Sequence, residues 1–299
     1  MFSLKPNLFG MSIVAILIVV VAFFYFNRKS EEYEPVPSKD SSNTLQEPIF
    51  KKKEQKEYKQ GKVQEEGLEI PEFSSDEIIV RHTHYTLCYS EEHEQAKWVA
   101  YQLDARELQK EAERGNDFRP DPAVPTGSSL PEDYRGSGYD RGHLAPAGDF
   151  AFSQEAMSET FYMSNMSPQV PELNREGWRI LEETIREWAK RDKSLLIVTG
   201  PVLKGKMKKI GKRNKVSVPP AYYKVVVDIT EPEKKGIGFI MPNAVITKPI
   251  HEYALTIAEV EKETGINFFP KLADSLEREL ENYNQWSTWF KKVNRRSKR

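Results

Sequence analysis

DYRGSGYDRGHLAP, residues 133–146, is the stretch that decides how this chain is interpreted. Three glycines and a proline interrupt any regular element, so the stretch is predicted to form a shaped loop. From Asp140 to His143 it offers a carboxylate, a guanidinium, a glycine and an imidazole. An imidazole can accept a proton at neutral pH, and Arg141 beside it can hold a phosphate or a developing negative charge. The stretch therefore predicts general-base chemistry, with a turn that happens to contain a histidine as the structural alternative.

A second polar group begins at Asn174, which stands at the start of an expected amphipathic helix. Asparagine is a preferred N-cap residue, so a helix cap is the structural interpretation of this position. Glu182 lies eight residues further on, about 80° around the helix and roughly 12 Å along it. That gap is too long for both side chains to ligate one ion directly. A hard cation bound by the Asn174 oxygen, with Glu182 holding one of its waters, fits the spacing, and magnesium takes few protein ligands.

The composition excludes several classes of protein. The chain has 299 residues, of which 38% are hydrophobic, 30% charged and 11% aromatic, so neither a multi-span membrane protein nor a wholly disordered chain is expected. A single cysteine, Cys88, excludes an intrachain disulfide and a Cys-rich zinc module. The net charge of −1 argues weakly against a nucleic-acid partner for the chain as a whole.

The chain is predicted to have four parts. Residues 1–26 are a membrane anchor, because residues 8–26 are almost wholly apolar and would span about 28 Å as a helix. This anchor predicts a single-pass membrane protein, with the catalytic domain extracytoplasmic if the source is bacterial; a cleaved signal peptide is the alternative. Residues 27–73 are predicted to be a flexible charged tether, residues 74–290 a globular domain, and residues 291–299 a basic tail.

The order of expected elements in the globular part is irregular. Helices are predicted over residues 178–188, 257–264 and 272–290. Strands are predicted over residues 78–89, 98–101, 195–198, 222–229 and 237–241, with a helix left open as the alternative near residues 98–112. Strands and helices do not alternate regularly, so we predict an α+β fold.

These motifs together resemble the DNA/RNA non-specific endonuclease family, the endonuclease G-like ββα-metal (His-Me finger) nucleases. Asp140-Arg141-Gly142-His143 matches the Asp-Arg-Gly-His signature of that family. A second block matches in type and spacing, from Asn165-x-x-Pro168-Gln169 to Leu173-Asn174-x-x-x-Trp178-x-x-Leu181-Glu182. Flanking matches, which include Phe118-Arg119-Pro120-Asp121-Pro122, extend the similarity from about residue 78 to residue 269.

The resemblance implies a ββα-metal nuclease domain with a mixed or antiparallel sheet and flanking helices, here preceded by the N-terminal transmembrane helix. It implies a magnesium-dependent endonuclease that hydrolyses DNA and RNA without sequence preference, with manganese able to substitute. His143 would be the general base that activates water. Asn174 would be the one direct protein ligand of the magnesium ion, and Glu182 would hold the ion through water.

Three further positions receive roles from the same resemblance. Arg119 would stabilise charge on the pentacovalent phosphate, and Arg141 would help to position it. Asp140 would brace the loop rather than touch substrate. Two basic blocks, residues 204–215 and 291–299, either attract phosphate backbones or serve as a solubilising loop and tail.

Other interpretations remain beside this one. A catalytically silent nucleic-acid-binding protein on the same fold would be indicated by loss of His143 or Asn174, and both are present. A zinc protein would use His82, His84 and His93, for which the sequence shows no fourth ligand nearby. The predicted partners are DNA, RNA and a membrane contacted through residues 8–26. A homodimer cannot be derived from the sequence.

Overall fold

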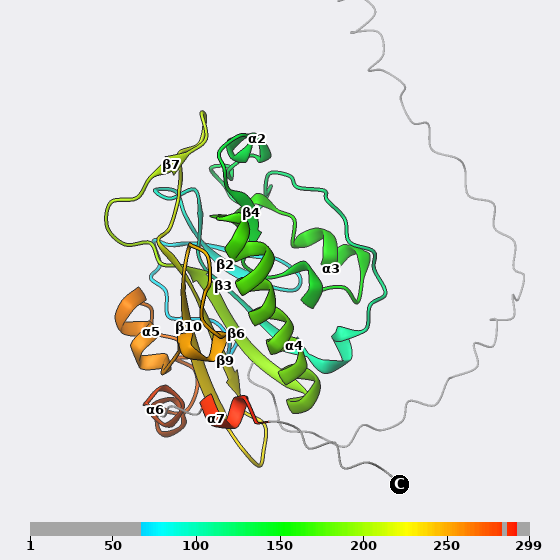
Figure 1. The fold of residues 1–299 in the computed structure, drawn as a ribbon, viewed down its shortest axis with the longest axis vertical. Coiled ribbons are helices and arrows are strands. Elements are labelled where there is room, and N and C mark those ends of the chain that lie inside the picture. The colour runs from blue at the N-terminus through cyan, green and yellow to red at the C-terminus, as the bar shows by residue number, and fades with distance from the viewer. Residues whose placement is uncertain (1–66, 283–285, 292–299) are drawn as a thin grey trace, which may run out of the picture. The chain divides into compact units, whose positions relative to one another are not determined.

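A seven-stranded antiparallel sheet forms the centre of the domain in the computed structural model, which describes residues 67–282 and 286–291 (Figure 1). The strands lie in the order β1-β2-β3-β6-β9-β10-β11, and each is antiparallel to the next. They are β1 (Ile78–Arg81), β2 (Thr86–Ser90), β3 (Gln95–Asp104), β6 (Ser194–Pro201), β9 (Ala221–Asp228), β10 (Lys235–Pro242) and β11 (Ala254–Leu255).

Helices cover both faces of this sheet, so its central strands are apolar along nearly their whole length. Helix α4 (Arg179–Asp192) packs on one face, where it meets Val226 of β9. Helices α5 (Ile257–Thr264) and α6 (Asp274–Asn282) pack on the other face against Val225 and Val227, the neighbours of Val226. This alternation of side chains means that Lys224, two residues before Val226, faces the same side as α4.

Short elements build the end of the domain at which β4 lies (Figure 1). Strands β4 (Asp140–His143) and β5 (Met166–Gln169) form one two-stranded sheet, and β7 (Lys209–Ile210) and β8 (Val216–Ser217) form another. The remaining helices and turns are α2 (Pro131–Tyr134), α3 (Gln154–Glu159), α7 (Trp286–Trp289), the 3₁₀ turns η1 (Ala105–Leu108), η2 (Ala147–Asp149), η3 (Met163–Asn165) and η5 (Ile250–Tyr253), and the π-helical turn η4 (Leu173–Trp178).

The predicted α+β class is confirmed, with local differences. The helix expected over residues 257–264 is found at those residues as α5, where Thr256 and Glu259 form a capping box. The single strand expected over residues 78–89 is a pair, β1 and β2, because the chain turns between them. The predicted loop at residues 140–143 is strand β4, since β5 pairs with all four of its residues. A side chain at Gly142 would overlap that of Gln169, so the pairing requires glycine there.

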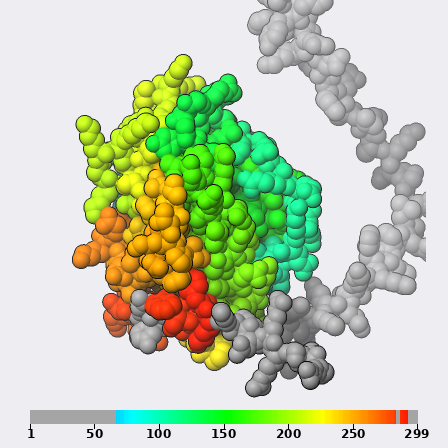
Figure 2. All heavy atoms as spheres, viewed as in Figure 1, coloured from blue at the N-terminus to red at the C-terminus, as the bar shows by residue number. Residues whose placement is uncertain are grey.

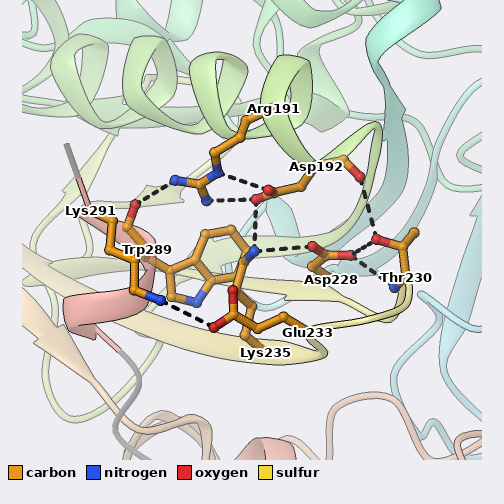
Figure 3. Close-up of polar contacts among 8 residues, drawn as sticks. All are labelled: Arg191, Asp192, Asp228, Thr230, Glu233, Lys235, Trp289 and Lys291. Carbon is orange, nitrogen blue, oxygen red and sulfur yellow. Dashed lines mark hydrogen bonds and ion pairs between the residues drawn. The ribbon is translucent and has the colours of Figure 1, made fainter. Parts of the chain in front are cut away.

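The C-terminal helix α7 is attached to the end of α4 by a buried group of charges (Figure 3). Lys235 is 4% exposed, and its Nζ lies 3.0 Å from Oδ2 of Asp192 and 3.2 Å from Oδ2 of Asp228. Arg191 donates a hydrogen bond of 2.9 Å to the backbone oxygen of Trp289, whose ring Lys235 also contacts. The single helix expected over residues 272–290 is found as two helices, α6 and α7; residues 283–285 between them are not among the described residues.

Ile70 belongs to the domain although it precedes the boundary predicted at residue 74. Its side chain is 5% exposed within the core cluster under α5, and the nearby Glu72 amide donates to the Asn267 oxygen. Residues 67–73 therefore contribute to the packed structure.

The predicted single-pass membrane localisation is contradicted. No helix within residues 67–282 and 286–291 is long and apolar enough to cross a bilayer. The segment 8–26, on which the prediction depended, lies outside the described residues, as do residues 27–66 of the predicted tether and residues 292–299 of the predicted basic tail.

Candidate active site

His143 ends β4 and is held in an aromatic frame. Its ring centroid lies 4.8 Å from that of Phe161, edge to face, and 5.8 Å from that of Phe118. The residue is only 8% exposed, and its Nε2 atom is buried without a hydrogen-bond partner among the described residues. A buried ring nitrogen that nothing else in the domain engages is free for a ligand, a water or a proton.

Two arginines stack on the same two rings. The Cζ atom of Arg114 lies 5.4 Å from the Phe161 centroid, and that of Arg141 lies 4.1 Å from the Phe118 centroid. Burial, reinforced by the charges of Arg114 and Arg141, lowers the pKa of His143 to about 3. The imidazole is therefore neutral at neutral pH and can act as a proton acceptor.

Asp140, at the start of β4, orients Asn174. Its carboxylate accepts a hydrogen bond of 3.0 Å from Nδ2 of Asn174 and two, of 2.7 and 2.8 Å, from Arg175. Burial opposes ionisation, but the hydrogen bonds from Arg175 and Asn174 outweigh it and lower the pKa of Asp140. Because the amide nitrogen is turned to Asp140, the Asn174 oxygen points away from it and makes no hydrogen bond with a described residue. The oxygen is thus available as a ligand.

Asn174 is not a helix cap. It lies within the π-helical turn η4, and neither η4 nor α4 has a side-chain hydrogen bond at its N-terminus. The amide is engaged with Asp140 instead, so the predicted capping role is not observed. Single π-helical turns inside helices frequently occur at functional sites.

Glu182 lies in the first turn of α4, half-buried, and makes no hydrogen bond or ion pair with a described residue. Burial raises its pKa to about 7; Lys224 opposes that rise and Asp149 adds to it. Lys224 is 1% exposed, and its Nζ donates a 3.4 Å hydrogen bond to the backbone oxygen of Leu144, the neighbour of His143. Lys224 therefore connects the surroundings of Glu182 with the strand that carries His143.

A buried network supports this side of the site. Asp149 is 2% exposed and accepts hydrogen bonds of 2.8 Å from the Tyr101 hydroxyl and from Nη1 of Arg186. Arg186 lies four residues after Glu182, on the same face of α4. Through Arg186 and Asp149, the network attaches one face of α4 to the loop that follows His143. Glu182 lies on that same face.

Arg119 is not brought to His143. Its Nη1 donates to the side chain and backbone of Asp117 and to the Ser158 oxygen, and its Cζ lies 4.1 Å from the Tyr162 ring centroid. A single bridge joins Arg119 to Tyr162, and the Arg119 amide donates to the Phe161 oxygen. Neighbouring side chains alternate, so Phe118 and Phe161 face His143 while Arg119 faces the opposite side.

Beside Arg141, the structure places a second arginine, Arg114, near His143, and the motif comparison missed it. Its sequence signal was weak, because it stands four residues before the matched segment at Phe118. Lys224 was also missed as a site residue. A lysine inside an apolar strand gives no sign of its partner until β9 is set beside α4.

The histidines of the zinc interpretation do not converge. His82 pairs with Asp121 at 2.9 Å, His84 pairs with Glu159 at 2.8 Å, and His93 lies 3.0 Å from Oγ of Ser217. Within the described ranges, no group of three or more His, Cys, Asp or Glu side chains could hold a metal ion.

The site has the donors for a hydrated hard cation rather than for zinc. Among the residues that the structure describes, the Asn174 Oδ1 atom accepts no hydrogen bond and the Glu182 carboxylate has no hydrogen-bond or ion-pair partner. Magnesium keeps several waters and takes few protein oxygens, so this sparse set suits it. Oxygen donors for a cation, a neutral imidazole and two arginines are groups that a hydrolase of phosphodiesters can use.

Comparisons with known proteins agree with that class. A family model described as DNA/RNA non-specific endonuclease matches residues 65–275. The mitochondrial nuclease EXOG of Danio rerio is 37% identical over 207 residues, 64% of this chain and 60% of that protein. Human mitochondrial endonuclease G is 34% identical over 202 residues, 63% of this chain and 68% of that protein. A solved EndoG/EndoGI complex aligns with a TM-score of 0.62 and 32% identity, covering 67% of this chain and 89% of that chain.

The chain belongs to the DNA/RNA non-specific endonuclease family, a family of hydrolases, and the resemblance seen in its motifs is confirmed. The matched segment spans about 60% of the length of the EXOG relatives.

Proposed function

We propose that this chain is a metal-dependent endonuclease that hydrolyses phosphodiester bonds in DNA and RNA with little sequence preference. The observation that carries the proposal is Nε2 of His143, which is buried without a hydrogen-bond partner among the described residues and lies in a frame that carries Arg114 and Arg141. This arrangement supports a base that works on the water next to a phosphate. In this proposal these groups act on the phosphate, and contacts to phosphate alone carry no sequence information.

The cation in this proposal is Mg²⁺, with Mn²⁺ able to substitute. Asn174 would hold it directly through Oδ1, and Glu182 would hold it through a bound water. When bound, such an ion neutralises charge on the phosphate and on the leaving 3′ oxygen. Support comes from the two oxygen donors that lack partners among the described residues and from Asp140, which sets the direction of the amide.

His143 takes the proton in the proposed reaction. A water in line with the scissile bond gives its proton to Nε2, its oxygen forms the new bond to phosphorus, and the bond from phosphorus to the 3′ oxygen breaks. The 3′ oxygen leaves with the electron pair of that bond and takes a proton from solvent water. Arg114 and Arg141 stabilise the negative charge that gathers on the phosphate oxygens. The bound phosphate also offsets these two positive charges, which raises the pKa of His143 from about 3 and strengthens the base when substrate is present.

Lys224 has a positioning role in the same proposal. Glu182 must be ionised to hold a metal-bound water, yet its burial favours the protonated form. The buried charge of Lys224 counteracts that effect. The Asp149 network fixes α4 so that Glu182 stays beside the site.

Cleavage of a supercoiled plasmid by the full chain tests this function. We expect cleavage with Mg²⁺ or Mn²⁺ and none with a chelator. The His143→Ala variant should cut about 10² to 10⁴ times more slowly while still binding nucleic acid. If the unaltered chain binds DNA but cuts none with either metal, the chain is the catalytically silent binding protein instead.

A further inference from the structure

The strand pair β7–β8 carries a concentration of positive charge. We call residues 204–217 the basic hairpin. No aspartate or glutamate occurs from residue 194 to residue 227. The hairpin holds seven basic side chains, Lys204, Lys206, Lys208, Lys209, Lys212, Arg213 and Lys215. Figure 2 shows its lime-coloured side chains projecting from the surface at the top of the view.

The hairpin is docked against the strand pair that carries His143. Ile210 and Val216 are buried in a cluster with Met166, the residue that pairs with His143 across β4 and β5. Asn214 donates a 2.8 Å hydrogen bond to Asp133 of α2. The turn requires Gly211, whose φ of +85° and contact with Asp133 leave no room for a side chain. The positive charges are therefore held in place before any ligand arrives, which lowers the entropic cost of binding.

Six of the seven basic side chains form no ion pair with a described residue, whereas Lys204 pairs with Glu263. Lys209 and Lys215 donate to backbone oxygens, of Glu92 and Gly211. The other four, Lys206, Lys208, Lys212 and Arg213, make no side-chain hydrogen bond with a described residue. Lys208 lies with Nζ 5.1 Å from the ring centroid of Tyr139, one residue before β4. A groove of about 270 Å³ opens here; its lining includes Tyr139, Lys204, Lys206, Lys208, Pro219 and Pro220.

We infer that the basic hairpin and this groove are a binding site for the nucleic-acid backbone away from the bond that is cut. The inference rests on the proposed function and extends it. Tyr139 precedes His143 by four residues, which at about 3.3 Å per residue of strand is roughly 13 Å. This span exceeds the axial rise of about 3.4 Å between successive phosphates of one duplex strand, so Lys208 would contact a different phosphate from the one that reacts.

The chemistry of the groove favours nucleic acid over other polyanions. Free lysines line it on one side and an aromatic ring lies at its edge, the pairing that binds phosphates together with stacked bases. It is also continuous with β4, so one bound strand can contact both Lys208 and the frame around His143. Binding to an anionic membrane would require only the positive charge of the hairpin, not a groove that continues to β4.

The test uses the full chain carrying His143→Ala, so that binding is measured without cleavage. The variant with Lys206→Glu and Lys208→Glu is compared with its parent by fluorescence anisotropy on a 30-base-pair duplex. Loss of two phosphate contacts should raise Kd about tenfold or more near 0.15 M salt and reduce the slope of log Kd against log salt by about two. The matched control carries Lys190→Glu and Lys234→Glu, which change the net charge by the same amount. Lys190 lies in the last turn of α4, and Lys234 lies in the connection between β9 and β10.

A Kd within twofold of the parent, or an equal rise in the control, would overturn the inference. Vesicles of phosphatidylglycerol form a second arm: loss of vesicle binding with an unchanged duplex Kd would assign the hairpin to lipid and also overturn it. In the active chain, the same pair of substitutions should raise KM for the duplex relative to KM for bis(p-nitrophenyl) phosphate, which has a single phosphodiester. If the active chain cleaves neither substrate, the proposed function fails, and the anisotropy comparison still decides the hairpin.

Discussion

Arg114 and Arg119 offer the sharpest test of the site, because sequence similarity favoured Arg119 and the structure favours Arg114. The perturbation is the replacement of each arginine by glutamine in otherwise identical chains. Arg114 is exposed and stacks on Phe161, so Arg114→Gln removes a charge near His143 with little loss of packing. Arg119→Gln removes hydrogen bonds to Asp117, at 2.7 Å, and to the Ser158 oxygen, at 3.0 Å.

The two losses differ in kind and in size. Removal of one preorganised charge that stabilises a reacting phosphate costs about 10²- to 10³-fold in kcat, or roughly 3–4 kcal/mol. We expect a loss of that order for Arg114→Gln, with an unchanged Tm. Arg119→Gln should instead lower the free energy of unfolding by about 1–2 kcal/mol, since partly buried hydrogen bonds of charged groups are lost. Its kcat in the folded state should stay within about threefold of the parent.

The assay is kcat and KM on a plasmid at saturating Mg²⁺, with urea unfolding of each variant at the same pH. Arg114→Lys is the matched control, because it keeps the charge but not the planar stacking, and it should recover part of the lost activity. The reasoning is refuted if Arg119→Gln loses more kcat than Arg114→Gln while both variants remain folded.

Three further predictions concern stability. The pKa of His143 is about 3 in the folded chain and about 6.5 in the unfolded chain, so only the unfolded chain binds a proton there as the pH falls from 7 to 5. Over that range the free energy of unfolding of the parent should therefore fall by about 2 kcal/mol more than that of His143→Gln, measured by urea titration. A chain that begins at Gly67 should unfold at a higher temperature than one that begins at Ser74, because burial of Ile70 contributes about 2 kcal/mol; equal Tm values would place Ile70 outside the cooperative unit. Lys235→Met leaves two buried carboxylates without their shared cation and should lower the free energy of unfolding by about 3 kcal/mol; a change below about 1 kcal/mol in thermal or urea unfolding would contradict this account of Figure 3.

Local patterns in the sequence were sufficient for helix α5 and the central strands of the sheet. Helix α5 lies at the residues predicted, 257–264, and the capping box of Thr256 and Glu259 that starts it also acts within a few residues of the chain. The central strands were recognised from their apolar runs, which are also a signal carried by neighbouring residues. Strand β4 was not, because its glycine and polar residues become a strand only when β5 supplies the hydrogen bonds.

The sequence by itself determined the family, the α+β class and the identity of His143, Asn174 and Glu182 as candidates, since those signals are carried by residue type and spacing. Only the tertiary structure showed that Arg114 joins Arg141 near His143, and which way the Asn174 amide points. Both depend on side chains from distant segments: Phe161 carries Arg114, and Asp140 accepts from Asn174. The physical reason is that periodicity specifies the face on which a residue lies, whereas the partner on that face is set by how separate elements pack.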